Sequence, residues 1–193
     1  MPRLQERWVR GRRSRAARRW ARWALVSWSC GLAAPHAARA DDAQTARGWL
    51  PVALHAADAW ADDARLVWVE NDAPVDASGR ADAWGYLFYS PLQHAMRSYS
   101  VRDGALATAK DQAVSVAAPG LDAWLDSGAV LDAAFRRAAA DLGPEHRLEN
   151  LLLVRGVFAR DAAWVAVFVP AEGPRLFVVC DAQSGDVLRA WRG

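Results

Sequence analysis

The first forty residues have the pattern of a secretory leader, which limits the folded part of this 193-residue chain to the residues after position 40. Ten arginines and one acid surround or precede the apolar segment at residues 23–34, and Ala38-Arg39-Ala40 comes after it. A basic segment, a short apolar segment and a small-x-small site, in that order, are typical of a bacterial signal peptide. We therefore expect residues 1–40 to be a signal peptide cleaved after Ala40. Residues 41–193 would then form a single mature domain, periplasmic or secreted.

The same segment leaves three alternatives to simple cleavage. Its apolar part has 12 residues, two of them serine, whereas a membrane span needs about 20. An uncleaved signal-anchor is the main alternative, and the chain would then reach the membrane only through its leader. The twin-arginine route fits poorly, because Arg18-Arg19 lacks the hydrophobic pair expected after it. Lipidation at Cys30 also fits poorly, since Trp28 stands where that motif has a small residue.

The leader also carries the positive charge of the chain. The net charge is +2 for all residues, but residues 1–40 contribute +9, so residues 41–193 hold 14 basic and 21 acidic side chains. An acidic domain with scattered arginines is repelled by nucleic acid. We therefore expect no nucleic-acid partner.

Length and cysteine content favour one ordinary domain without disulfides. The 153 residues after the leader are enough for a single hydrophobic core. Cys180, the only cysteine among them, lies in an apolar run, so it is expected to be a small buried hydrophobe. A reactive thiol would need an exposed, electropositive setting.

Hydrophobic periodicity predicts two helices and several strands. Apolar residues at spacings of three and four predict a helix over residues 51–64, begun at Pro51 because proline suits a first turn. A second helix is predicted over residues 121–142, ending at Gly143-Pro144, with Asp126-Ser127 as the cap of its main segment. Strands are expected at residues 65–70, 83–89, 95–101, 149–157, 163–169, 175–180 and 186–191, with a weaker one at 113–116.

The two halves of residues 51–193 are alike in pattern. Each has a helix, then a strand, then an aromatic strand that opens with a tryptophan, Trp84 or Trp164. An internal duplication of about 70 residues explains this pattern, and chance similarity of two generic stretches is the alternative. We place repeat one at about 51–118 and repeat two at about 121–193.

The second half resembles the PepSY family of exported bacterial domains. Its turn Asp181-Ala182-Gln183-Ser184-Gly185-Asp186-Val187 is similar to that family's closing D-x-x-[ST]-G-x-[VI] hairpin. The resemblance implies an α+β fold class with two helix-plus-antiparallel-sheet repeats, PepSY- or cystatin-like, and leaves open whether they share a sheet. Inhibition or chaperoning of a protease has been proposed for some PepSY domains that lie in peptidase propeptides. That role is not carried over to this chain.

No catalytic or metal-binding constellation stands out. His55, His94 and His146 have no neighbour at metal-ligand spacing, so we expect neither a metal nor a cofactor. No Gly-x-Ser-x-Gly elbow is present. We therefore predict that the protein is not an enzyme. The alternative is a periplasmic hydrolase that uses Ser90 with His94, or Cys180, as its nucleophile, and a structural accessory of the envelope is a third possibility.

The aromatic strand at residues 83–89 is the best candidate for a contact surface. Trp84, Tyr86 and Phe88 share one face and Tyr89 lies on the other, while Gly85 could leave room for a bound segment. These four aromatic residues are the predicted binding residues, in a groove or at an edge strand that takes a peptide. Core packing beneath the helix is the alternative. The predicted function is an exported, non-catalytic domain that binds a protein or peptide in the bacterial envelope.

Overall fold

A computed structural model describes residues 43–113, 119–156, 158 and 161–193. The predicted signal peptide lies outside these described residues. The elements in chain order are α3 (Ala46–Trp60), β1 (Arg65–Asn71), β2 (Ala83–Ser90), β3 (Ala95–Arg102), β4 (Ala105–Gln112), α4 (Ser127–Leu142), β5 (His146–Arg155), β6 (Ala162–Pro170), β7 (Leu176–Asp181) and β8 (Val187–Arg192). Within the described part of the chain, neither helix has the length and apolar character that a membrane span requires.

All eight strands belong to one antiparallel sheet, in the order β4-β3-β2-β1-β5-β6-β7-β8. The two central strands, β1 and β5, pair directly, with Trp68 opposite Val154 and Val69 opposite Leu153. The expected α+β fold of two helix-plus-antiparallel-sheet repeats is therefore wrong. The β1–β5 pairing continues the hydrogen-bonded ladder across both halves, so the described residues form a β-rich fold in which two helices lie on a single sheet.

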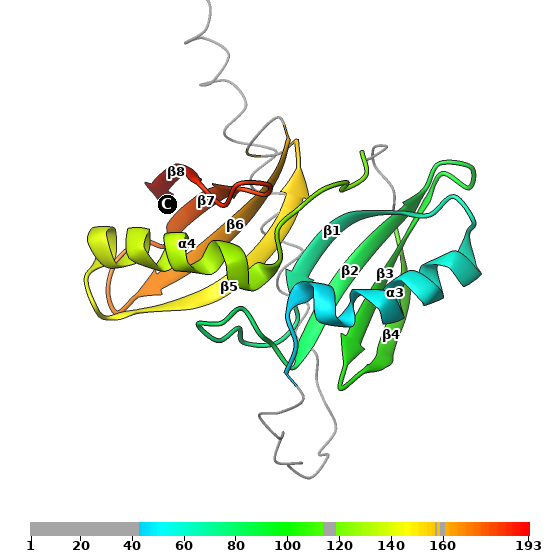
Figure 1. The fold of residues 1–193 in the computed structure, drawn as a ribbon, viewed down its shortest axis with the longest axis horizontal. Coiled ribbons are helices and arrows are strands. Elements are labelled where there is room, and N and C mark those ends of the chain that lie inside the picture. The colour runs from blue at the N-terminus through cyan, green and yellow to red at the C-terminus, as the bar shows by residue number, and fades with distance from the viewer. Residues whose placement is uncertain (1–42, 114–118, 157, 159–160) are drawn as a thin grey trace, which may run out of the picture. The chain divides into compact units, whose positions relative to one another are not determined.

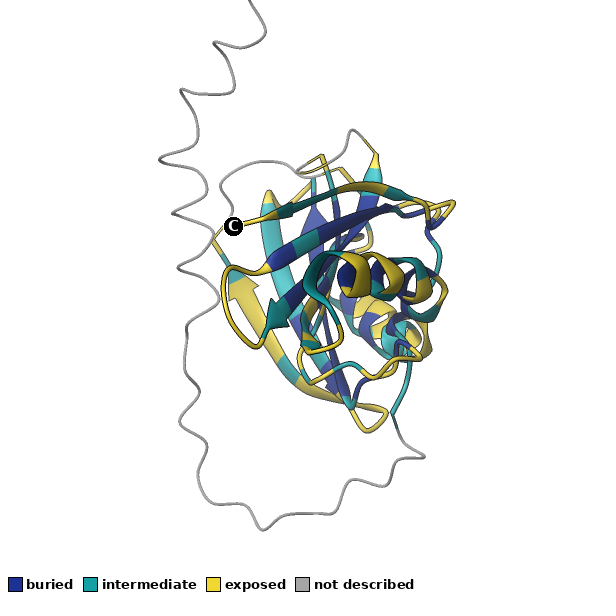
Figure 2. Ribbon diagram, turned by 90° about the vertical axis from the view of Figure 1, so that its left-hand side faces the viewer, coloured by how far each residue is buried: buried dark blue, intermediate teal, exposed yellow. Residues whose placement is uncertain are grey.

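Both helices pack on the same face of this sheet, which we call the helix face (Figure 1). One continuous core lies between the helices and the sheet, and it includes Trp84 of β2 and Trp164 of β6, whose rings meet edge to face with centroids 6.5 Å apart. Figure 2 shows the buried residues concentrated between the helices and the strands, with the outer sides of both helices exposed. The opposite side of the sheet, which we call the open face, faces away from both helices.

Local sequence patterns predicted the start of α4 correctly but not the start of α3. The predicted cap of α4 is confirmed, because the Asp126 carboxylate accepts the backbone N–H of Ser127 at 2.8 Å. The predicted start of α3 at Pro51 is wrong, because the helix begins at Ala46 and contains Pro51. The backbone N–H of Ala46 donates to the Ser127 hydroxyl, so the true start depends on a residue distant in the chain.

One observed strand has no counterpart among the predicted strands, and one predicted strand cannot be compared. The edge strand β4 has no run of alternating apolar residues, because most of its side chains are exposed on both faces. The turn Asp103-Gly104 that leads into it has a clear sequence signal, and Gly104 has the positive φ of 72° that favours glycine there. The weaker strand predicted at residues 113–116 lies almost wholly outside the described residues.

Candidate binding surfaces

The four aromatic residues predicted to bind a partner are buried. Trp84 and Phe88 are fully inaccessible, and Tyr86 and Tyr89 nearly so. Trp84, Tyr86 and Phe88 lie on the helix face within the main core, which is the core packing considered as the alternative. In this structure the four side chains therefore form no exposed contact surface.

Two of these side chains hold the amino end of α3. The Trp84 indole N–H donates to the carbonyl of Gln44 at 2.8 Å, and the Tyr86 hydroxyl donates to the carbonyl of Ala46 at 2.7 Å. Burial raises the pKa of the Tyr86 hydroxyl, so it stays a neutral donor. Their polar atoms are therefore used to position a helix.

The space left by Gly85 is occupied by the chain itself. A Cβ atom at this position would lie 2.9 Å from Oδ1 of Asp72. The carboxylate of Asp72, from the loop after β1, thus lies against the backbone of β2. No room for a bound segment remains at Gly85.

The serine considered as a nucleophile is bonded to a carboxylate. The buried Ser90 hydroxyl donates to Oδ1 of Asp63 at 2.6 Å and accepts the backbone N–H of Gln93 at 3.1 Å. His94 is exposed in the following turn, and among the described residues it makes no hydrogen bond to Ser90. The structure therefore does not bring Ser90 and His94 together as a nucleophile and its base.

The other nucleophile and metal candidates are also separated. Cys180 is buried, and burial raises the pKa of its thiol to about 11. The imidazole Nδ1 of His146 lies 2.7 Å from the carbonyl of Gly143. Within the described ranges, no three His, Cys, Asp or Glu side chains are grouped so that they could hold a metal ion.

The open face of the sheet carries a second apolar cluster. Five small residues on β5, β6 and β7 are buried there: Val154, Ala163, Val165, Val167 and Val179. Four larger side chains pack around them and remain partly exposed: Trp68, Leu152, Phe177 and Trp191. Neither described helix covers this cluster, because both helices pack on the helix face.

Aromatic rings extend this cluster toward the β8 edge. Phe177 and Trp191 stack with centroids 5.2 Å apart and planes 8° from parallel, and Phe158 lies 5.7 Å from Trp191. The Arg189 guanidinium lies 5.0 Å from the Trp191 ring centroid. None of these residues is among the predicted binding residues, although Phe177 and Val179 alternate with core residues of β7. The alternation marks two apolar faces, but it does not tell which face a helix covers.

A separate depression lies where α3 ends, with a volume of about 340 Å³. Its lining consists of Asp58, Ala59, Trp60, Ala61, Asp62, Asp63, Leu92 and Gln93. The two sides are tied together by Asp63, whose Oδ2 accepts the backbone N–H of Leu92 at 2.6 Å. The hydrogen bond from the Ser90 hydroxyl lowers the pKa of the Asp63 carboxyl, and that from the Leu92 amide adds to this.

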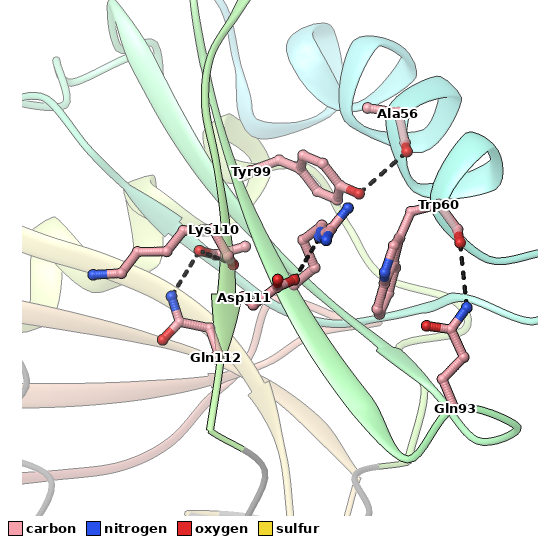
Figure 3. Close-up of polar contacts among 9 residues, drawn as sticks. Ala56, Trp60, Gln93, Tyr99, Lys110, Asp111 and Gln112 are labelled. Carbon is pink, nitrogen blue, oxygen red and sulfur yellow. Dashed lines mark hydrogen bonds and ion pairs between the residues drawn. The ribbon is translucent and has the colours of Figure 1, made fainter.

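Figure 3 shows the neighbouring polar contacts among α3, the turn after β2 and the strands β3 and β4. The Gln93 amide donates to the carbonyl of Trp60 at 3.3 Å, so the turn after β2 is bonded to the last residue of the helix. The guanidinium of Arg97 lies 5.2 Å from the Trp60 ring centroid and pairs with Asp111 at 2.7 Å. The hydrogen bonds of Asp63 and Gln93 thus join the turn after β2 to the end of α3, on the two sides of the depression.

Comparison with known proteins supports the fold only. No family model and no curated protein matches the chain, so the PepSY resemblance stays a prediction. A crystal structure from Clostridium difficile 630, of a protein described as a "putative lipoprotein", is similar in fold with a TM-score of 0.53. It is 8% identical in sequence, and the match covers 73% of this chain and 90% of that one.

Proposed function

We propose that this chain is an exported protein of the bacterial envelope that binds a protein or peptide without catalysing a reaction. The observation that carries the proposal is the apolar and aromatic cluster on the open face, around Phe177 and Trp191. Contiguous apolar patches on a folded protein mark interaction sites, and tryptophan is enriched among the residues that dominate binding energy. This surface replaces the buried β2 residues as the proposed contact site.

Two further observations support the envelope location. Residues 1–40 have the order of segments found in bacterial secretory signals. The clostridial protein of similar fold is described as a "putative lipoprotein", and an envelope location of this chain would agree with that description.

Site-specific photo-crosslinking in bacteria that export the protein tests this proposal. A photoreactive amino acid replaces Phe158, which is 42% exposed beside Trp191, and Leu54 on α3, which is 39% exposed, is the matched control position. We expect a discrete crosslinked product from position 158 and none from position 54. Equal products from the two positions, or none from position 158, would overturn the open face as the contact site.

Cell fractionation tests the location separately. Release of the shortened protein with the periplasmic or culture fraction is expected if the leader is a cleaved signal. Retention of the full-length protein in the cytoplasm would contradict export, whatever the crosslinking shows.

A further inference from the structure

The apolar cluster on the open face occupies five neighbouring strands and is symmetric about the middle one. These strands lie in the order β1-β5-β6-β7-β8, so β6 has two of them on each side. The cluster residues of β6 are small, whereas each of the four flanking strands contributes one large side chain: Trp68, Leu152, Phe177 and Trp191. On the outer strands β3 and β4 the same face is polar, with Ser98, Ser100 and Thr108.

Opposite charges stand on the two sides of this cluster, at the same number of strands from its centre. One row across the open face consists of residues that are paired directly from strand to strand: Glu70, Leu152, Val165, Val179 and Arg189. Glu70 on β1 and Arg189 on β8 are both exposed. Neighbouring strands are about 4.8 Å apart, so each charge lies about 10 Å from Val165, which is the centre of the row.

This arrangement is complementary to a second copy of itself. Consider two open faces packed together and related by a half-turn about an axis parallel to β6. The half-turn exchanges the two sides of the row, so Glu70 of each copy faces Arg189 of the other, and apolar strands face apolar strands. A half-turn about an axis along the row would instead place like charges opposite each other, which is repulsive. The charges therefore favour one orientation of the two faces.

The area of the apolar half of the open face is sufficient for a stable dimer. Its five strands have 6 to 10 residues each. At about 4.8 Å between strands and about 3.4 Å per residue, they span roughly 600 Å² in each copy. Two such faces together cover roughly 1,200 Å², which exceeds the about 1,000 Å² expected of a specific interface. Antiparallel sheets also pack face to face in β-sandwiches, with their strands within about 30° of each other.

We propose that this protein forms a symmetric dimer in which the open faces of two copies pack together about a two-fold axis parallel to β6. The inference rests on the proposed function, because it names a second copy of this chain as the protein that binds the open face. The large side chains around Phe177 and Trp191 supply the apolar contact. Two ion pairs between Glu70 and Arg189 of opposite copies fix the orientation at the two sides of the interface.

Sedimentation equilibrium of the protein purified from bacteria that export it tests the dimer. We expect a reversible equilibrium between monomer and dimer in the range of about 1–100 µM. Glu70→Arg and Arg189→Glu should each weaken association at least about tenfold, because each places two pairs of like charges in the dimer. Lys110→Glu is the matched control, since Lys110 is exposed on the same face but lies on β4, outside the five strands. A monomer throughout this range, or equal weakening by the control, would overturn the proposal.

A mixture of the two charge variants tests the pairing itself. In a dimer of one Glu70→Arg chain and one Arg189→Glu chain, both facing pairs are again opposite in charge. We expect the mixture to regain the association that each variant alone has lost, and association no stronger than that of the single variants would overturn the proposed axis. Urea midpoints by tryptophan fluorescence show which variants are folded. Arg189→Glu lies on an edge strand, so it tests the interface even if Glu70→Arg does not fold.

The photo-crosslink from position 158 separates this inference from the proposed function. A dimer predicts a product of twice the mass of the chain, in which mass spectrometry finds peptides of this chain only. A product that contains a different protein would overturn the dimer and leave the open face as a contact site. Absence of any product would overturn both.

Discussion

Asp126 and Arg47 are 79 positions apart in the chain, yet Oδ1 of Asp126 accepts the backbone N–H of Arg47 at 3.0 Å. The same oxygen accepts the N–H of Ser127 at 2.8 Å, so one carboxylate caps the amino ends of both α3 and α4. Thr45, which precedes α3, makes no side-chain cap of its own. The positive ends of two helices thus converge on one negative charge supplied by the chain itself.

This shared cap predicts a large effect for a single truncation. Asp126→Ala should lower the free energy of unfolding by about 1–2 kcal/mol, because each helix loses an acceptor for a free backbone N–H. Asp126→Asn should lower it less, since the amide oxygen can still accept. Urea unfolding followed by tryptophan fluorescence measures both changes.

Asp132→Ala is the control for this prediction. Asp132 lies on α4 but is exposed, and within the described part of the chain it pairs only with Arg136 one turn away. Its loss should change the free energy of unfolding by less than about 0.5 kcal/mol. If Asp126→Ala were no worse than Asp132→Ala, the shared cap would contribute nothing to stability.

The contact between Trp84 and Trp164 predicts coupling between two strands that do not pair. Each indole N–H donates at 2.8 Å to a carbonyl just before a helix, that of Gln44 for Trp84 and that of Leu125 for Trp164. Replacing either tryptophan by phenylalanine should lower the free energy of unfolding by about 1–3 kcal/mol, because the hydrogen bond and part of the side-chain volume are lost. The double variant should lose about 0.5–1.5 kcal/mol less free energy of unfolding than the two single variants added together, because the two rings are in contact. Strict additivity in the urea data would contradict the coupling.

Gly79 predicts where the loop before β2 tolerates no side chain. Its φ is +81°, and a Cβ atom there would lie 2.3 Å from the backbone nitrogen of Gly128 at the start of α4. Gly173 offers a matched control, because its φ is +95° but a Cβ atom would meet nothing within 4 Å. Gly173→Ala should lower the free energy of unfolding by about 1 kcal/mol, from backbone strain alone. Gly79→Ala should lower it by at least twice as much, because the clash with Gly128 adds to the strain. Equal losses in thermal or urea unfolding would show that the loop moves away from α4 at little cost.

Sequence patterns located most helices and strands, but they could not predict how these elements pack and pair with one another. Alternation in residues 83–89 correctly separated the two faces of β2, since Trp84, Tyr86 and Phe88 do share one face. It could not show that a helix covers that face, because burial is set by packing between distant elements. The continuous sheet depends on the pairing of β1 with β5, whose residues are more than eighty positions apart. Nothing local in either strand specifies that partner.

The candidate surfaces could not be predicted from the sequence either, because they are formed by contacts between elements that are distant in the chain. Trp60 lies within the helix predicted over residues 51–64, and nothing in the sequence placed Leu92 near it. Both line the same depression because Asp63 and Gln93 bond the turn after β2 to the end of α3. Such a surface belongs to tertiary contacts and has no signature in residue spacing.

Asp63 predicts how stability responds to acid. Its pKa in the folded state lies below the ordinary value of 3.8, because the carboxylate accepts hydrogen bonds from Ser90 and Leu92. Between the folded and unfolded pKa values, the unfolded state binds more protons. The contribution of Asp63 to stability is therefore complete above the unfolded value, and is lost as the pH falls through the lower folded value.

Asp63→Asn isolates this contribution from that of other carboxyls, including Asp111, whose pKa is also lowered by its partner Arg97. The variant should be less stable than the wild type near pH 6, and the difference between the two proteins should shrink as the pH falls below about 4. Urea midpoints measured across that range give the comparison. Two parallel profiles would mean that Asp63 has the same pKa in the folded and unfolded protein.

Cys180 predicts a thiol that reports on unfolding. It is buried in the core, and burial, with a smaller contribution from Asp186, raises the pKa of its thiol to about 11. At pH 8 only about one Cys180 thiol in a thousand would be ionised, and burial keeps a thiol-labelling reagent in the solvent from reaching it. In a Cys30→Ser background, where Cys180 is the only cysteine, an aromatic disulfide reagent should label the folded protein extremely slowly. Labelling should become fast across the same urea range in which tryptophan fluorescence changes. Rapid labelling without urea would show that the thiol is accessible in the native protein, and would restore Cys180 as a candidate nucleophile.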